Sequence, residues 1–321
     1  MQLQNAARKE ESGYASSVVK EFLAHVRDGL RKPQKQLSPK YFYDEKGSGY
    51  FDKICQLEEY YPYKSELKLM PIVARDISRI LTDRYSVVEF GAGSLTKVRP
   101  LLDWLRKIDQ FVPIDISGEH LRSACEELSG DYPGVNITPI EADFSHEVDL
   151  SGVNAKRLGF FPGSTIGNFT PAQAKSFLGS AGKTLGPDSY FIIGVDTKKS
   201  PTFLHHAYND AQGITAKFNL NMLHRINNDL KCDIPVHYFE HYAHYNALKG
   251  CVEMHLVSTK NFECNIAGES IHFSAGESIH TENSYKYHPE EFTALAEKAG
   301  WSTQKIWMAE RDMFSIFLLK Y

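Results

Sequence analysis

The sequence lacks an excess of charge of either sign. Lysine and arginine total 36 and aspartate and glutamate total 40, which leaves a net charge of −4 over 321 residues. No block of like charges stands out, so no surface is expected that would attract a polyanion. We therefore do not expect a nucleic acid as a partner.

Paired cysteines and long apolar runs are also missing. The five cysteines are scattered, odd in number and form no C-x-x-C motif, which favours thiols in a reducing compartment. The first residues, MQLQNAARKEES, lack the apolar core of a signal peptide, and no stretch reaches the roughly 20 apolar residues that cross a bilayer. These absences predict a cytoplasmic protein that does not use a membrane, and we expect a monomer.

What the chain does contain is an alternation of helices and short strands. Apolar positions at helical spacing predict an amphipathic helix over residues 17–31, before Pro33. Residues 37–66 mix aromatics with Gly, Asp and Glu without a clean period, which indicates ordered loops with a short helix. The apolar strands that follow are VVEF near 87, FVPIDI near 111, ITPIEA near 137, RLGFF near 157 and YFIIGVD near 190. Their alternation with helices is typical of a doubly wound parallel sheet.

The second half of the chain changes its pattern twice. Between about 197 and 286, a long helix from Phe203 to Ile226 precedes glycine-punctuated strands, which we interpret as an inserted α+β lobe. At the end, STQKIWMA and DMFSIFLLK are joined by AERD and predict an antiparallel hairpin at a sheet edge. We therefore expect three parts, which are an N-terminal helix with a substrate-lobe segment (1–65), a cofactor-binding domain (66–196 with 287–321) and an inserted substrate-binding lobe (197–286).

The segment VVEFGAGSLTK places a buried strand, an acid and a Gly-Ala-Gly turn before a helix. Gly91 and Gly93 leave bare backbone N–H groups and room for a ligand to approach. The dinucleotide fingerprint G-x-G-x-x-G needs a third glycine for close packing around a pyrophosphate, and here that position is Thr96. The turn therefore argues against NAD.

Acidic residues end the next two strands. Asp115 lies 24 positions after Gly91, where a carboxylate can accept both hydroxyls of a ribose. Asp143 and Phe144 suit the amino group of an adenine and its ring face, whereas a phosphate would call for clustered Lys or Arg. The pattern indicates an adenosine without phosphate, and S-adenosylmethionine fits it. The alternative interpretation is that each Asp caps the helix that follows.

Several motifs resemble those of the histidine Nα-methyltransferases of the ergothioneine pathway. They are YFYDEKGSGYFDKICQLEEYYP, EFGAGSLTK, PIDISGEHL, EADF, FPGSTIGNFTP and HTENSYKY, and the match runs from about residue 37 to the C-terminus. The resemblance implies a Rossmann-like class I methyltransferase fold, S-adenosylmethionine as cofactor and a small amino acid as substrate. This family includes relatives that act on tryptophan-derived substrates. Two positions depart from its pattern, since Tyr63 stands where a small hydroxyl residue is more common and Ala92 replaces a serine.

The resemblance also implies ligand contacts, residue by residue. The positions that look like cofactor contacts are Tyr43, Gly91, Lys97, Asp115, Asp143 and Phe144. The positions that look like substrate contacts are Tyr60, Gly163, Asn168, Tyr208, Glu282 and Ser284. Among the latter, Glu282 and Ser284 resemble the pair that hydrogen-bonds an imidazole. Asn168 and Tyr43 are the positions that we expect to act in the catalytic step.

Asn168 suits a methyl transfer for a chemical reason. Transfer from a sulfonium is an in-line displacement that needs a lone pair, and an ammonium has none. An amide oxygen accepts a hydrogen bond from a neutral amine and its NH₂ group donates to a carboxylate, whereas a carboxylate would favour the ammonium. The alternative role, capping of the next helix, is assigned to Thr170, which stands before Pro171.

Glu282 makes the case for histidine. A carboxylate opposite an imidazole N–H sets the tautomer of the ring and is left unpaired by a side chain that lacks this donor. The alternative for Glu282 is an exposed charge on a surface strand, and the alternative for each tyrosine is core packing with a satisfied hydroxyl.

His237, His241 and His244 have the helical spacing of metal ligands. Their neighbourhood, VHYFEHYAHYNAL, is aromatic and prone to form a strand, which would turn His244 to the opposite face. We therefore expect no metal.

The sequence thus predicts trimethylation of L-histidine to hercynine, the first step of ergothioneine biosynthesis. One alternative is an N-methyltransferase for another amino acid or amine, for example a tryptophan-like one, because Tyr63 and the inserted lobe could reshape the pocket. A second alternative is a cofactor-binding protein without catalysis, against which the presence of Asn168, Glu282 and Ser284 speaks.

Overall fold

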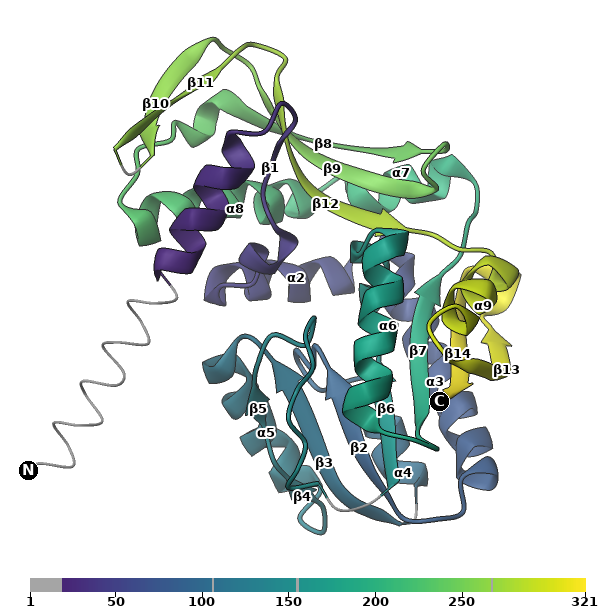
Figure 1. Ribbon diagram of the computed structural model, residues 1–321. Coiled ribbons are helices and arrows are strands. Elements are labelled where there is room, and N and C mark those ends of the chain that lie inside the picture. Colours follow the sequence, from purple (N-terminus) through teal and green to yellow (C-terminus); the bar gives the residue numbers. More distant parts are fainter. Residues whose placement is uncertain (1–18, 106, 154–155, 267) are drawn as a thin grey trace, which may run out of the picture. The chain divides into compact units, whose positions relative to one another are not determined.

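The computed structural model describes residues 19–105, 107–153, 156–266 and 268–321. The chain divides into two compact units, which are described one at a time (Figure 1). Unit 1 consists of the described part of Met1–Gln56 with Tyr208–His244 and Glu253–Glu282, and unit 2 consists of Leu57–Ala207, Tyr245–Val252 and Asn283–Tyr321. These bounds differ from those of the three parts expected from the sequence, which stay a prediction. Among the described residues, no helix has the length and apolarity that a membrane crossing needs.

Unit 2 is built on an eight-stranded sheet with the order β13-β14-β7-β6-β2-β3-β4, in which β5 also pairs with β3. The parallel strands are β2 (Tyr85–Phe90), β3 (Ile108–Asp115), β4 (Asn136–Ile137), β5 (Ile140–Glu141), β6 (Lys156–Phe161) and β7 (Tyr190–Asp196). The predicted strands are confirmed, except that the ITPIEA segment forms two short strands instead of one. Pro139 lies at the break, where it has no N–H to donate to the ladder.

Helices cover both faces of this sheet. One apolar core contains side chains of α3 (Tyr61–Ile80), α4 (Arg99–Trp104) and α5 (Gly118–Asp131), and the other contains those of α6 (Pro171–Leu185) and α9 (Pro289–Glu297). Val87 of β2 points into the first core and Val88 into the second, as the two-residue period of a strand requires. All six residues of β2 are buried, so both of its faces lie against apolar side chains. The doubly wound α/β fold is therefore confirmed.

The C-terminal hairpin is also confirmed. β13 (Ser302–Met308) pairs with β14 (Phe314–Lys320), and β14 pairs with β7, both in antiparallel register. The expected cap of α6 is present as well, because the Thr170 side chain accepts from the Gln173 N–H.

Unit 1 contains residues 19–30 as a helix, so the described part of the predicted helix is confirmed, and residues 17 and 18 lie outside the described residues. Its strands β1 (Lys35–Gln36), β8 (Phe239–Asn246), β9 (Cys251–Ser258) and β12 (Ser278–Tyr285) belong to a four-stranded sheet with the order β1-β12-β9-β8. The ends of β8, β9 and β12 fall in unit 2. A separate hairpin consists of β10 (Phe262–Ile266) and β11 (Glu269–Phe273), and η3 (Val236–Tyr238) precedes β8.

The prediction of ordered loops with a short helix over residues 37–66 is right about a helix but underestimates the helical content. The segment contains η1 (Pro39–Phe42), α2 (Glu45–Gln56) and the beginning of α3. Its aromatic rings pack on a single partner, because Phe42, Tyr43 and Phe51 all contact the ring of Phe218 on α8 (Ile214–Leu230). Tertiary packing of this kind stabilises a helix that contains two glycines, Gly47 and Gly49.

The single long helix expected from Phe203 to Ile226 is also wrong. The segment forms α7 (Pro201–Tyr208) and α8, which begins after a left-handed Gly213 with a φ of +65°. The carboxylate of Asp210 accepts hydrogen bonds from the N–H groups of Ile214 and Thr215, at 2.9 and 2.7 Å. An acid that satisfies the first free N–H groups begins a new helix, and this interrupts the apparent period.

Candidate active site

The predicted ligand contacts of unit 2 follow the carboxyl ends of its parallel strands. Gly91 comes directly after β2, Asp115 is the last residue of β3, Asp143 lies two residues beyond β5, and Gly163 lies two beyond β6. Parallel strands bring their carboxyl ends to one edge of a sheet, which is where α/β proteins bind ligands. The structure therefore places these residues along one edge.

The glycine turn after β2 has the backbone that the sequence predicts. Gly91 and Gly93 have φ values of +66° and +52°, which favour glycine over other residues. A Cβ on Gly91 would lie 3.2 Å from the ring of Phe144, so the ring and the bare backbone are in close contact. A side chain at Gly91 would therefore be strained and would displace Phe144.

Local hydrogen bonds hold both strand-end aspartates. Asp115 accepts from the N–H of Ser117 at 2.8 Å and, more weakly, from that of Gly93 at 3.3 Å. Asp143 accepts from the N–H and the hydroxyl of Ser145, at 3.0 and 2.5 Å. Since Ser117 is the N-cap of α5, Asp115 also supports the start of that helix. The capping interpretation and the ligand interpretation thus describe the same fixed carboxylate.

The chemistry of this edge fits an adenosine without phosphate. Carboxylates accept from hydroxyl and amino groups, and the Phe144 ring offers an apolar face. The expectation of bare N–H groups at the turn is wrong, because the N–H groups of Gly91 and Ala92 donate to the carbonyl of Ile114 and that of Gly93 donates to Asp115.

Beneath the turn, Glu89 on β2 is fully buried, and its Oε2 makes no hydrogen bond to any described residue. Burial raises the pKa of Glu89 well above its ordinary value, although the charge of Lys97 opposes this shift. Glu89 therefore keeps its proton to a higher pH than an exposed glutamate does.

Lys97 is held in place by a buried glutamate. Its ammonium lies 2.6 Å from Oε2 of Glu66, which is 1% exposed, and 5.1 Å from the ring centroid of Tyr63. The N–H of Gly163 donates to both oxygens of the same carboxylate, at 2.9 Å each. Glu66 thus links a predicted cofactor contact to a predicted substrate contact. Tyr63, which departs from the family pattern, covers the ammonium.

Asn168 is the last residue of η2 (Thr165–Asn168), in the loop that follows β6. Its side chain is half-buried, and its amide makes no hydrogen bond to any described residue. Because Thr170 caps α6, the capping alternative for Asn168 is not what the structure has. The preceding loop is strained, with φ values of +82° at Gly163 and +55° at Ser164, and strain of this kind is concentrated at functional sites.

The remaining predicted contacts divide between the two units. Tyr60 and Ser284 belong to unit 2, and Tyr43, Tyr208 and Glu282 belong to unit 1. Tyr43 packs edge-on against Phe51 and Phe218. Tyr208 is buried, and its carbonyl lies 2.8 Å from Nε2 of His241. Glu282 is only 9% exposed on β12, so it is not the surface charge of the alternative interpretation.

Comparison with known proteins identifies the family. A model of the family described as histidine-specific, SAM-dependent methyltransferases matches residues 22–321. This chain belongs to that family. Its cofactor chemistry is therefore that of S-adenosylmethionine, and the carboxyl edge of the sheet in unit 2 has the groups that such a cofactor needs.

The relatives of this methyltransferase include enzymes named for different substrates. The histidine N-alpha-methyltransferase of Mycolicibacterium smegmatis is 35% identical over 95% of this chain and 96% of its own length. The protein of the same name from Mycobacterium tuberculosis is 34% identical over 91% and 92%. The 4-dimethylallyltryptophan N-methyltransferase of Aspergillus fumigatus is 27% identical over 88% and 89%. Among solved structures, the methyltransferase CcbJ of Streptomyces caelestis is 13% identical, with a TM-score of 0.47 over 78% and 94% of the two chains.

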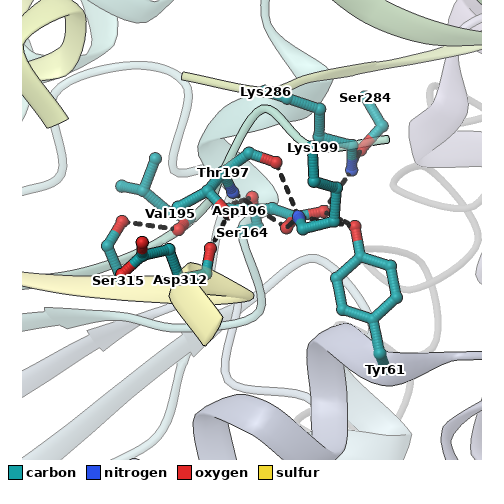
Figure 2. Close-up of polar contacts among 10 residues, drawn as sticks. All are labelled: Tyr61, Ser164, Val195, Asp196, Thr197, Lys199, Ser284, Lys286, Asp312 and Ser315. Carbon is teal, nitrogen blue, oxygen red and sulfur yellow. Dashed lines mark hydrogen bonds and ion pairs between the residues drawn. The ribbon is translucent and has the colours of Figure 1, made fainter. Parts of the chain in front are cut away.

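Unit 2 of this methyltransferase also contains a buried ionic network that the sequence analysis missed. Figure 2 shows Lys199, Lys286 and the hydroxyl of Tyr61 converging on Asp196, the last residue of β7. The distances to the carboxylate are 2.5 Å for Lys199, 2.7 Å for Lys286 and 2.7 Å for Tyr61. Burial alone would raise the pKa of Asp196, but the charges of Lys286 and Lys199 hold it below its ordinary value. Burial in turn lowers the pKa of Lys199 to about 8.

Two features of the sequence of this methyltransferase indicate that Glu66 and Asp196 are buried acids. Glu66 lies on the apolar face of α3, four positions after the buried Pro62 and four before the buried Met70, where a solvated acid is not expected. Asp196 ends the apolar strand YFIIGVD at the same edge as Asp115. An acid on an apolar stripe needs a buried partner, but the sequence does not say which lysine provides it.

The predicted strand is β8, which contains His241 and His244, whereas His237 belongs to η3. Nδ1 of His241 lies 2.9 Å from the side-chain nitrogen of Asn219. His244 instead lies with Glu253 and His255, and the potential ligand atoms of these three residues are within 4.8 Å of one another. His244 and Glu253 are 3.4 Å apart, a separation typical of an ion pair, and the hydroxyl of Ser278 lies 3.1 Å from Nδ1 of His255.

Proposed function

We propose that this chain transfers methyl groups from S-adenosylmethionine to the α-amine of L-histidine and forms hercynine, the trimethylated product, as the first step of ergothioneine biosynthesis. The family match and two relatives named histidine N-alpha-methyltransferase, at 34 and 35% identity over most of the chain, support the proposal. The observation that carries it is the state of Asn168. Its amide stands beside a strained loop at the cofactor edge, half-buried and without a partner among the described residues.

Asn168 would orient the amine in its neutral form. Its amide oxygen accepts an amine N–H, and its NH₂ group donates to the substrate carboxylate. Gly163 assists with its carbonyl, because its N–H is already donated to Glu66. Correct alignment alone can contribute about 7–11 kcal/mol to lowering a barrier of this kind. No covalent nucleophile is needed in this scheme.

The cofactor would be held by residues that the resemblance and the geometry both indicate. Gly91, Asp115, Asp143 and Phe144 bind its nucleoside, and Lys97 and Tyr43 bind its amino acid end. When bound, S-adenosylmethionine supplies the electrophilic methyl group. Lys97 is suited to a carboxylate because its ammonium is fixed by Glu66 and still has further donors.

The substrate assignment gives the imidazole to Glu282 and Ser284, and the carboxylate and amine to Tyr60, Asn168 and Tyr208. The burial of Glu282 supports it, because a buried carboxylate rejects a side chain that cannot donate to it. We also propose that the enzyme works in the cytoplasm as a monomer. The scattered cysteines of the sequence support the compartment, and light scattering measures the mass.

Mass spectrometry tests the proposal. L-Histidine incubated with the enzyme and S-adenosylmethionine should gain one, two and then three methyl groups on its α-nitrogen. A parallel thermal-shift screen of the twenty amino acids and of tryptophan-derived amines, with S-adenosylhomocysteine present, should show the largest stabilisation with histidine. If another amine is methylated and histidine is not, histidine is not the substrate of this enzyme. Cofactor binding without any methyl transfer would mean a protein without catalysis.

A further inference from the structure

Tyr63 and Glu66 lie three positions apart near the start of α3, so their side chains project from the same face of this helix. Both of them contact Lys97. The Nζ atom of this lysine lies 2.6 Å from Oε2 of Glu66 and 5.1 Å from the centroid of the Tyr63 ring, which is within the range of a cation–π contact. A single turn of α3 thus presents a carboxylate and an aromatic face to one ammonium.

The backbone of Gly163 closes a third side of this ammonium. A Cβ at Gly163 would lie 3.2 Å from Nζ of Lys97, and the φ of +82° at this glycine also disfavours a side chain. The side chain of Lys97 is 15% exposed, and Glu66 is the one carboxylate within ion-pair distance of it in the part of the chain that the structure describes. An ammonium enclosed in this way has few alternative positions.

The two side chains that contact Lys97 hold it in different ways. An ammonium has three N–H donors, and the carboxylate of Glu66 accepts from one of them. An aromatic ring attracts the charge through its quadrupole and occupies at most one further N–H. The ring of Tyr63 therefore restrains Lys97 and keeps water from one side of it, while a donor is left for the carboxylate of a ligand.

A small residue at position 63 would leave this side of the ammonium to water. The small hydroxyl residue that the family pattern favours here is too short to cover Lys97 as the tyrosine ring does. A ligand carboxylate would then have to displace water and to immobilise the lysine as it binds, and both requirements lower affinity. With Tyr63 in place, the free protein already holds Lys97 in the position in which it binds a carboxylate.

We propose that Tyr63 is a positioning residue of the cofactor site, whose ring holds the ammonium of Lys97 in place for the carboxylate at the amino acid end of the cofactor. The inference rests on the part of the proposed function that gives this end to Lys97. It also decides between two roles of Tyr63, because the sequence leaves open that this residue reshapes the substrate pocket. Tyr63 strengthens cofactor binding and does not change which amino acid is selected.

Calorimetry with S-adenosylhomocysteine tests the contact between the ring and the ammonium. Tyr63→Thr should raise the Kd about 5- to 20-fold, whereas Tyr63→Phe keeps the ring and should stay within about twofold of wild type. Tyr190→Thr is the matched control, because Tyr190 also lies beside a lysine, Lys320, but at the amino end of β7. It should bind S-adenosylhomocysteine as wild type does. An equal loss in Tyr63→Phe and Tyr63→Thr would assign the effect to the hydroxyl and overturn the inference.

A shorter ligand makes the test specific to the carboxylate. Methylthioadenosine has the nucleoside and the sulfur of the cofactor but no carboxylate, so its Kd should be the same in wild type, Tyr63→Thr and Lys97→Met. In the Lys97→Met background, Tyr63→Thr should change the Kd for S-adenosylhomocysteine less than about twofold, because the ring then has no ammonium to hold. A purely structural role of Tyr63 would instead raise the Kd of both ligands by the same factor, which contradicts the inference.

Steady-state kinetics distinguish the two roles of Tyr63. With saturating S-adenosylmethionine, Tyr63→Thr should keep kcat and the KM for histidine within about twofold of wild type. A higher KM for histidine at unchanged S-adenosylhomocysteine affinity would place Tyr63 in the substrate pocket and overturn the inference. If Tyr63→Thr does not fold, Tyr63→Leu takes its place, and a Kd equal to that of wild type in this variant overturns the inference as well.

The outcomes also separate this inference from the proposed function. If wild type binds S-adenosylhomocysteine but leaves histidine unmethylated, the substrate assignment fails, and the calorimetric result still decides the role of Tyr63. If Lys97→Met binds S-adenosylhomocysteine as tightly as wild type, the role of Lys97 fails and the inference fails with it. If Lys97→Met weakens binding and Tyr63→Thr does not, the inference alone is wrong.

Discussion

Two charged clusters in unit 2 have opposite compositions. Around the glycine turn, two acids, Glu66 and Glu89, share the charge of one lysine, Lys97. At the end of β7, two lysines, Lys199 and Lys286, share one acid, Asp196. In each cluster, burial shifts the pKa of one member toward its neutral form. The pKa of Glu89 is raised in the first cluster, and the pKa of Lys199 falls to about 8 in the second.

The difference shows which charged group each cluster holds in a fixed position. In the first, a single ammonium remains as the active charge, held by Glu66 at the position that the resemblance gives to a cofactor contact. In the second, a single carboxylate holds the ammonium of Lys286, which also donates to the hydroxyl of Ser284. Buried charges cost free energy unless they are paired, so each cluster keeps one pair and one group that can become neutral.

The largest effect is expected when Glu66, the paired acid of the first cluster, is replaced. Glu66→Ala leaves the buried ammonium of Lys97 and the N–H of Gly163 without their acceptor. We expect a loss of about 3–5 kcal/mol in the free energy of unfolding and loss of methyl transfer. Denaturant unfolding and a methyl-transfer assay measure the two effects. Glu66→Gln keeps an acceptor oxygen for Gly163 and should be milder; equal effects of both variants would contradict the dual role of Glu66.

The second largest effect is expected when a charge is introduced at Asn168, which is neutral and lies on the loop after β6. Asn168→Asp retains the size of the side chain but favours the ammonium form of the substrate amine. The kcat at neutral pH should fall about 100-fold or more, while histidine and cofactor still bind. Single-turnover kinetics and calorimetry separate the two quantities. An activity near that of wild type would show that Asn168 does not face the amine, and Thr170→Ala serves as the control for the neighbouring helix cap.

The parts of this architecture that follow from local sequence were predictable. A buried strand and a Gly-Ala-Gly turn determine their own backbone, and the acids at the ends of β3 and beyond β5 followed from the alternation of strands and helices. Thr170 and Gln173 form a cap within four residues, so it was predictable too. Each of these features depends on neighbours in the chain.

What could not be predicted depends on partners far apart in the sequence. The pairs Glu66–Lys97 and Asp196–Lys286 span 31 and 90 positions, and nothing local to either lysine marks it as buried. The helical content of residues 37–66 was underestimated for the same reason, because Phe218, which contacts Phe51 of α2, lies on a helix far away in the sequence. Asp210, which separates α7 from α8, is a local cap that the apparent apolar period concealed.

Replacement of the buried Glu89 by glutamine, which is always neutral, is expected to raise the free energy of unfolding. The native state keeps the proton of Glu89 above its ordinary pKa of 4.5, whereas the unfolded chain releases it. The stability contributed by this group therefore falls as the pH rises above about 4.5. Glu89→Gln should remove that decline, so its advantage over wild type in denaturant midpoints should grow as the pH rises above about 4.5. Parallel pH profiles of the two proteins would mean that Glu89 is ionised in the native state.

The smallest effect is expected on the pH dependence of stability when Lys199, whose pKa is lowered, is replaced. Between about pH 8 and 10.5, the unfolded chain still holds the proton that native Lys199 has released, so the native state gains stability as the pH rises through this window. Lys199→Met should remove this rise and leave the profile below pH 8 parallel to that of wild type. Thermal melts across this pH range measure the slope. A slope that survives in Lys199→Met would show that a group other than Lys199 releases the proton in this window.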